Sequence, residues 1–197
     1  GKLTIVDHDR IGASNLNRQL VALNSTLGEK KTTVMAARLA DINPNLELTV
    51  KDQFVEIDET NALVTDQPYD FVIDCIDSII CKAALVVSAQ QLNVPVISSM
   101  GAGNRIDASR VKISTLKKTH ECALAREMRK QVRKLGGSLK YPVAFSDEPA
   151  RQPLPHQPVG GDHPGRPRAV NGTISYLPAL FGTLIAGEVC RQLILKL

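Results

Sequence analysis

The sequence lacks cysteines at metal-binding spacing. Its four cysteines, Cys75, Cys81, Cys122 and Cys190, form no CxxC pair and have no histidine ligand pattern beside them. Structural zinc sites use closely spaced cysteines and histidines, so we expect no zinc in this chain. The sequence also opens with no signal peptide. Cysteines stay reduced inside cells, and these four show no pattern that would suggest a disulfide framework. We therefore expect an intracellular, cytoplasmic protein.

Long apolar runs and internal repeats are absent too. The apolar segment that follows Pro178 is interrupted by Glu188, Arg191 and Gln192, so we expect a helix of the core and no membrane segment in this chain. Hydrophobic residues make up 43% of the sequence and charged residues 22%, which is typical of soluble globular proteins. A chain of 197 residues can bury one sizeable core, so we expect a single domain over residues 1–197.

The net charge of the whole chain is small, but basic residues are unevenly distributed along the sequence. The formal net charge is +4, and basic residues crowd the segment from 110 to 140. They are Arg110, Lys112, Lys117, Lys118, Arg126, Arg129, Lys130, Arg133, Lys134 and Lys140. Such a segment suits a polyanionic partner such as RNA, although a solvated helix face explains it equally well.

Apolar strands alternate with helical segments through the first half of the chain. The pattern predicts strands at 2–6, 46–55, 71–77 and 94–99, a short helix or turn at 15–23, and helices at 28–42, 58–65 and 78–92. This alternation is typical of a Rossmann-like α/β fold, with a mostly parallel sheet flanked by helices. An antiparallel strand at 111–116, a basic helix at 122–135, a strand at 141–146 and a final helix after Ser175 extend it.

Prolines and glycines dominate residues 147–170. We expect a loop there, because this composition disfavours a packed element. A lid over a substrate and a plain surface excursion are equally compatible with it.

A dense polar cluster follows the first predicted strand. Asp7 and Asp9 come directly after the apolar run, and an acid at such a strand end commonly accepts hydrogen bonds from ribose hydroxyls. Arg18, with Asn15 and Gln19 beside it, supplies donors suited to phosphate. A surface pair between a strand-end acid and an arginine is the alternative.

Two further residues extend this cluster. Asp77 follows the strand at 71–77, so we expect it at the same sheet edge as Asp7. A carboxylate there is suited to hold Mg²⁺, which bridges to phosphate oxygens. Lys31, early in a predicted helix, would neutralise charge on a reacting phosphoryl group; taken alone, it also fits a solvent-facing lysine.

These residues resemble the ATP-dependent adenylating superfamily of ubiquitin-activating enzymes and their bacterial relatives ThiF and MoeB. The similar runs are Asp7-His8-Asp9, Ser14-Asn15-Leu16-Asn17-Arg18-Gln19, Gly28-Glu29-Lys30-Lys31, Asn43-Pro44 and Asp74-Cys75-Ile76-Asp77. The resemblance covers about the first half of the chain. It implies ATP bound with its ribose at Asp7, near Asp9, and its phosphates at Asn15, Arg18 and Gln19. It also implies a catalytic Lys31 and a magnesium-binding Asp77.

The second half resembles one branch, the tRNA threonylcarbamoyladenosine dehydratases of the TcdA type. Its similar runs are Gly101-Ala102-Gly103, Ile106-Asp107, Lys117-Lys118-Thr119, Leu124-Ala125-Arg126, Phe145-Ser146-Asp147-Glu148 and Gly172-Thr173-Ile174-Ser175-Tyr176. The resemblance implies a homodimer that cyclises the modified adenosine of tRNA through an acyl adenylate. Cys122 is not needed as a nucleophile on that route, and we expect a buried or helix-start thiol.

Three other functions stay open at this point. The chain could activate the C-terminal glycine of a ubiquitin-like sulfur-carrier protein, as ThiF and MoeB do, but those relatives usually carry the CxxC zinc ligands that are missing here. An NAD-dependent dehydrogenase would use Asp7 but not Arg18, Lys31 and Asp77. A non-catalytic dimer partner is the third.

The glycine-rich turn of this superfamily, of the GxGGxG type, does not occur in the sequence. It would precede Gly1, so we expect the numbering to begin inside a domain, after the first strand. We also expect the chain alone to bind ATP weakly or not at all, because that turn supplies the backbone donors for the phosphates.

Overall fold

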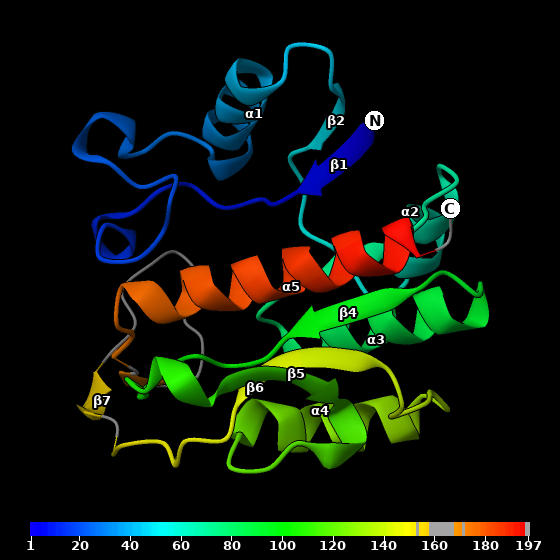
Figure 1. Ribbon diagram of the computed structural model, residues 1–197. Helices are drawn as coiled ribbons and strands as arrows, with labels where there is room; N and C mark the ends of the chain where they lie inside the picture. The colour runs from blue at the N-terminus through cyan, green and yellow to red at the C-terminus, as the bar shows by residue number, and fades with distance from the viewer. Residues whose placement is uncertain (153, 158–167, 171, 196–197) are drawn as a thin grey trace. The chain divides into compact units, whose positions relative to one another are not determined.

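The computed structural model describes residues 1–152, 154–157, 168–170 and 172–195. These residues form two compact units, Gly1–Glu59 and Thr60–Leu197. Each unit is described by itself below (Figure 1). The single domain expected over residues 1–197 stays a prediction.

The first unit is built on two parallel strands. β1 (Lys2–Val6) pairs with β2 (Glu47–Lys51) in register from Lys2 with Glu47 to Val6 with Lys51. Between them in sequence lies α1 (Lys31–Ile42), the crossover that a parallel pair requires. The helix ends before Asn43-Pro44, because proline disfavours helical geometry in the residue before it.

Of the short helix or turn predicted at 15–23, the segment before α1 has the turn. The chain forms a 3-10 turn at Ala13–Asn15, and a second one at Asn24–Thr26. The side-chain oxygen of Asn15 accepts a hydrogen bond from the Gly12 backbone N–H at 3.0 Å. Such local side-chain bonds compete with helix formation. α1 starts three residues later than predicted, because Gly28 has φ +82°, outside the helical region.

The second unit contains a four-stranded sheet in the order β3, β4, β6, β5. β3 (Val72–Asp74), β4 (Val96–Ser99) and β6 (Pro142–Ser146) run parallel. β5 (Val111–Thr115) is antiparallel to β6, which confirms the predicted antiparallel extension. A short helix, α2 (Thr60–Thr65), opens the unit.

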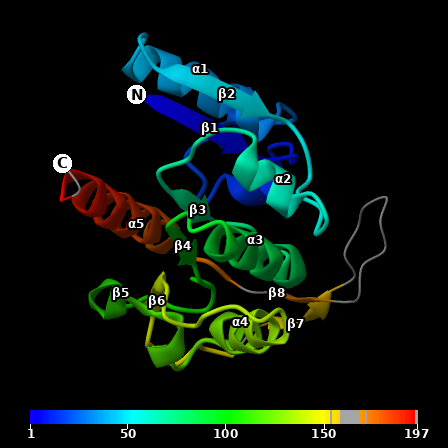
Figure 2. The same cartoon turned by 90° about the vertical axis from the view of Figure 1, so that its right-hand side faces the viewer.

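Helices cover both faces of this sheet. α3 (Ile79–Gln91) and α4 (Ala123–Lys134) lie on one face, and α5 (Tyr176–Ile194) lies on the other (Figures 1 and 2). Neighbouring residues of one strand serve the two faces, since successive side chains of a strand alternate. Val143 and Phe145 pack with α3 and α4, while Ala144 packs against α5. The predicted α/β fold with flanking helices is confirmed.

α5 is long and apolar enough to cross a membrane by length and composition. Its Phe181, Ile185 and Val189 are buried in one cluster with Ile97 and Ala144 of the sheet. These contacts fit the predicted core helix.

The proline-rich segment holds two short strands, where we expected no regular element. β7 (Leu154–Gln157) and β8 (Arg168–Val170) pair in antiparallel fashion. Prolines are tolerated in such a pair because each strand keeps a free edge. Residues 158–167, the centre of the loop expected over 147–170, lie outside the described residues. The two alternatives for this loop, a lid over a substrate and a surface excursion, concern those residues.

Candidate functional site

The strand-end acids of the first unit hold a lysine. The Lys31 ammonium lies 2.6 Å from an Asp9 carboxylate oxygen and 4.0 Å from one of Asp7. Asp7 also accepts a hydrogen bond from the Asp9 backbone N–H at 2.8 Å. The Lys31 side chain is 16% exposed, which does not fit the solvent-facing alternative. Asp7, Asp9 and Lys31 therefore form one group, which we call the acid–lysine group.

Backbone pairing brings Lys31 to Asp9, which lies 22 residues before it in the chain. The Lys31 N–H donates to the Asp9 carbonyl at 3.0 Å, and the Ile11 N–H donates to the Glu29 carbonyl at 2.9 Å. The two segments thus run antiparallel, and neighbouring side chains point to opposite sides. Lys30 accordingly turns away from Asp9 and pairs with Asp52.

The predicted phosphate donors lie together in the turn that follows. The Arg18 guanidinium donates to the Ser14 carbonyl and to the Asn17 side-chain oxygen, both at 2.9 Å. The Gln19 N–H donates to the Asn15 carbonyl at 2.9 Å. Within the described part of the chain, no carboxylate pairs with Arg18.

Asp7, His8 and Asp9 together offer three metal-ligand atoms within 4.8 Å of one another. The Lys31 ammonium already lies against Asp9. A divalent cation there would face that positive charge at close range. These residues therefore suit a cationic side chain better than Mg²⁺.

Asp77 belongs to the second unit, between β3 and the start of α3. Its carboxylate is exposed and makes no hydrogen bond or ion pair with any residue that the structure describes. A free carboxylate at a strand end can coordinate a cation. That Asp77 lies close to Asp7 and Lys31 at one sheet edge stays a prediction.

A buried ion pair supports the segment that carries Asp77, and sequence reasoning missed it. Asp74 and Lys82 are fully buried and lie 3.0 Å apart. The Lys82 ammonium also donates to the Asp74 and Ile76 carbonyls at 3.3 and 3.1 Å, and the Ser98 hydroxyl donates to Asp74 at 2.5 Å. Burial raises the pKa of the Asp74 carboxyl, which Lys82 opposes.

One sequence signal could have revealed this pair. Lys82 is the single charged residue within the apolar stretch 79–89, and such a buried charge needs a partner. Through its two carbonyl contacts, Lys82 fixes the backbone immediately before Asp77.

Cys122 is placed as expected. It is the N-cap residue of α4, it is buried, and its sulfur accepts a hydrogen bond from the Ala125 N–H at 3.5 Å. The helix-start thiol is confirmed.

Comparisons with known proteins agree with this architecture. The sequence model of the ThiF family matches residues 1–196. The tRNA threonylcarbamoyladenosine dehydratase of Bacillus subtilis is 35% identical over 98% of this chain and 78% of its own length. That of Haemophilus influenzae is 31% identical over 100% and 77%.

A solved structure agrees as well. The crystal structure of Escherichia coli TcdA, a tRNA N6-threonylcarbamoyladenosine dehydratase in complex with AMP, is similar with a TM-score of 0.85 and 30% identity. The match covers 100% of this chain and 77% of that one. The family model, the relatives and the fold point the same way, and the chain belongs to the ThiF family.

Proposed function

We propose that this chain carries out the ATP-dependent dehydration of threonylcarbamoyladenosine in tRNA. The observation that supports this most directly is the likeness to dehydratases along the whole chain, 98% of it in the Bacillus subtilis relative. The E. coli relative has been solved with AMP and with ATP. Activation of a sulfur-carrier protein is the weaker candidate, because the second half of the chain is also similar to the dehydratases.

The proposed nucleotide site uses the polar groups of the first unit. Asp7 and Asp9 would accept hydrogen bonds from the ribose hydroxyls. Asn15, Arg18 and Gln19 would donate to the phosphates. Arg18 is suited to this because its present partners, the Ser14 carbonyl and the Asn17 amide oxygen, are neutral. Its full positive charge is available to a phosphate, and the guanidinium fork matches phosphate oxygens.

Asp77 fits a magnesium ligand. Its carboxylate is exposed and unpaired among the described residues, and Mg²⁺ prefers carboxylate oxygens next to substrate phosphates. When bound, the ion would screen the charge of the phosphates and of the departing pyrophosphate. The Lys82 contacts to the Asp74 and Ile76 carbonyls would keep the Asp77 backbone in place.

The proposed reaction has two steps. A carboxylate oxygen of the threonyl group attacks the α-phosphorus of ATP, and the bond to pyrophosphate breaks. Lys31 and Arg18 stabilise the negative charge that builds up on the phosphoryl oxygens. The carbamoyl group of the same nucleoside then attacks the acyl carbon, the ring closes and AMP leaves. AMP keeps one oxygen of the carboxyl group and the attacking carbamoyl group gives up a proton to solvent, so the nucleoside, counted as its acid, has lost one water.

The test uses the full-length protein with ATP and Mg²⁺, supplied either with tRNA bearing threonylcarbamoyladenosine or with a ubiquitin-like carrier protein. We expect AMP to form with the tRNA and the modified nucleoside to lose the mass of one water. AMP formation only with the carrier would assign the chain to sulfur-carrier activation, and no AMP with either acceptor would favour a non-catalytic dimer partner. We also propose a cytoplasmic homodimer, which the family resemblance implies.

A further inference from the structure

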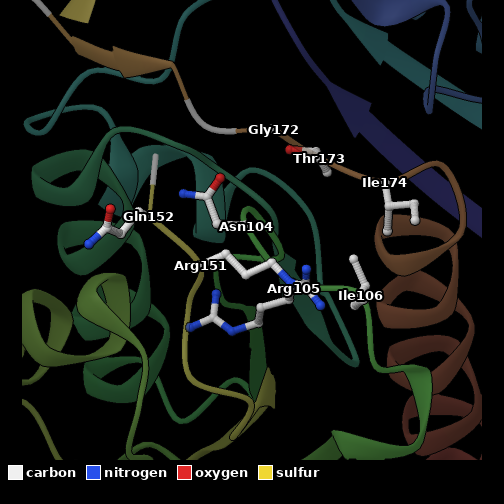
Figure 3. Close-up of a pocket in the computed structure, with 8 residues that line it drawn as sticks. All are labelled: Asn104, Arg105, Ile106, Arg151, Gln152, Gly172, Thr173 and Ile174. Carbon is white, nitrogen blue, oxygen red and sulfur yellow. The ribbon is translucent and has the colours of Figure 1, made fainter. Parts of the chain in front are cut away.

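The second unit contains a pocket that the proposed chemistry does not use. It has a volume of about 330 Å³ and is lined by the segments 104–106, 151–152 and 172–174 (Figure 3). Two arginines, Arg105 and Arg151, line it, and we call it the arginine pocket. Both lie outside the basic segment 110–140 that the sequence offered as an RNA-binding face.

Arg105 gives the pocket a buried positive charge. Its side chain donates to the Glu148 carbonyl at 3.0 Å, to those of Gly101 and Gly103 at 3.2 and 3.0 Å, and to that of Glu121 at 2.5 Å. The residue is 5% exposed. All these acceptors are neutral, and no carboxylate among the described residues forms an ion pair with it.

Glu148, whose backbone carbonyl accepts from Arg105, has its carboxylate engaged elsewhere. The Glu148 carboxylate accepts the backbone N–H groups of Ile106 and Asp107 at 2.9 and 2.8 Å. Among the described residues, the charge of Arg105 is therefore stabilised by carbonyl dipoles and not by an ion pair. A charge removed from water in this way acts more strongly on a nearby anion.

Arg151 supplies a second, accessible guanidinium. Its backbone N–H donates to the Asn104 carbonyl at 2.8 Å, which fixes the residue at the pocket. The side chain is exposed and makes no hydrogen bond or ion pair with the part of the chain that the structure describes. Figure 3 shows it beside Arg105, with the amides of Asn104 and Gln152 nearby.

Three basic residues of the segment 110–140 offer a contrast. Arg110 and Lys112 both pair with Asp147, and Lys130 pairs with Glu127 at 3.0 Å. Paired lysines and arginines have part of their charge neutralised already. Arg151 is not in that position, so its donors are available to a ligand.

We propose that the arginine pocket binds a backbone phosphodiester of the RNA substrate. The inference rests on the proposed function, which makes tRNA the substrate. A guanidinium binds a phosphodiester through two parallel hydrogen bonds, and the buried Arg105 adds a positive charge to the same pocket. Arg151 thereby holds the RNA chain and takes no part in the reaction itself.

The experiment measures binding of an RNA stem-loop that bears threonylcarbamoyladenosine to the full-length protein, over about 50 to 200 mM salt. Three variants are compared with the wild type: Arg151→Gln, Arg151→Lys and Arg191→Gln. Arg191→Gln is the matched control, because it removes the same charge near the far end of α5, where Arg191 pairs with Glu188. Steady-state KM values for ATP are measured in parallel.

We expect Arg151→Gln to weaken stem-loop binding about tenfold, the value of a charge-assisted hydrogen bond. The slope of log affinity against log salt should fall by about 0.7 to 0.9, the change for one lost phosphate contact. Arg151→Lys should keep the slope, because it keeps the charge. The KM for ATP should change less than about twofold, because losing one charge-assisted hydrogen bond to ATP would raise it much more than that.

Three results would overturn the inference. The first is that Arg151→Gln binds the stem-loop as tightly as Arg191→Gln does, and the second is that Arg151→Gln leaves the salt slope unchanged. The third is that Arg151→Gln raises the KM for ATP, which would assign the pocket to the nucleotide. Because binding is read without turnover, Arg151-dependent binding of the stem-loop without any dehydration would contradict the proposed function and leave the pocket assignment standing.

Discussion

Lys31 and Lys30 are neighbours in the sequence with different surroundings. The Lys31 ammonium lies between the carboxylates of Asp9 and Asp7, whereas Lys30 pairs with Asp52 on the other side of the chain. We predict that Lys31→Ala lowers kcat about 100- to 1,000-fold, as for the loss of a preorganised donor at a reacting centre. AMP release in the steady state measures this effect.

Lys30→Ala is the matched control for that measurement. It removes the same side chain one residue away and an exposed ion pair, so we expect kcat to change less than about twofold and stability by at most about 1 kcal/mol. Equal losses of kcat in the two variants would contradict the role of Lys31 in the reaction.

The Asp74–Lys82 pair leads to a prediction about stability. Lys82→Met leaves the Asp74 carboxylate buried without its cation, and we expect unfolding free energy to fall by about 3 to 5 kcal/mol. Urea unfolding measures it. The double variant Asp74→Asn with Lys82→Met should recover part of the loss, because no buried charge is left. A double variant as unstable as Lys82→Met would show that packing, and not charge, is what Lys82 supplies.

At the scale of elements, Gly137 sets the spacing between α3 and α4. A Cβ atom there would come within 2.6 Å of a Val87 methyl and 2.9 Å of a Val132 methyl. We predict that Gly137→Ala destabilises the protein by about 1 to 3 kcal/mol, the usual cost of overpacking. The midpoint of urea unfolding is the readout.

Gly182 is the natural comparison for Gly137. It lies within α5, and a Cβ atom there would meet nothing within 4 Å. Since alanine favours helices over glycine, Gly182→Ala should stabilise the protein by about 0.5 to 1 kcal/mol. If Gly137→Ala and Gly182→Ala both shift the midpoint of urea unfolding in the same direction, the tight packing assigned to Gly137 is contradicted.

The edge pairing of β5 with β6 carries a pH dependence. Asp147, directly after β6, pairs with Lys112 and Arg110 at the edge formed by β5. The hydrogen bonds from Lys112 and then Arg110 lower the pKa of Asp147 to about 2. Its unfolded pKa is about 3.9, so its stabilisation is complete above that pH and is lost as the pH falls towards 2.

Comparison of Asp147→Asn with the wild type tests this dependence. The difference in unfolding free energy between the two proteins should shrink below about pH 4, as Asp147 of the wild type takes up its proton. Urea unfolding at a series of pH values measures it. A difference that stays constant through the acid range would mean that Asp147 is not held ionised by Lys112 and Arg110.

For the whole molecule, we predict a homodimer. Most soluble oligomers are symmetric homodimers, and the family resemblance implies the same arrangement here. Sedimentation equilibrium of the full-length protein should give twice the mass of one chain. A single-chain mass at every concentration measured would exclude the dimer.

The sequence predicted the α/β class and most elements of the second unit correctly, because strand and helix patterns are local. α3 (Ile79–Gln91) lies within one residue of its predicted bounds. Of the short helix or turn expected at 15–23 the structure has the turn, since the Gly12 N–H donates to the Asn15 side chain, and α1 begins later than predicted because Gly28 is left-handed. Neither can be read from apolar periodicity.

By itself, the sequence determined the fold class and the polar runs around Asp7, Arg18 and Asp77, because each of these depends on residues close together in the chain. Only the tertiary structure decided that Lys31 returns to Asp9 and that Arg105 draws its acceptors from several segments. The physical reason is that a charge leaves water only where distant segments supply its partners, and that supply is a property of packing.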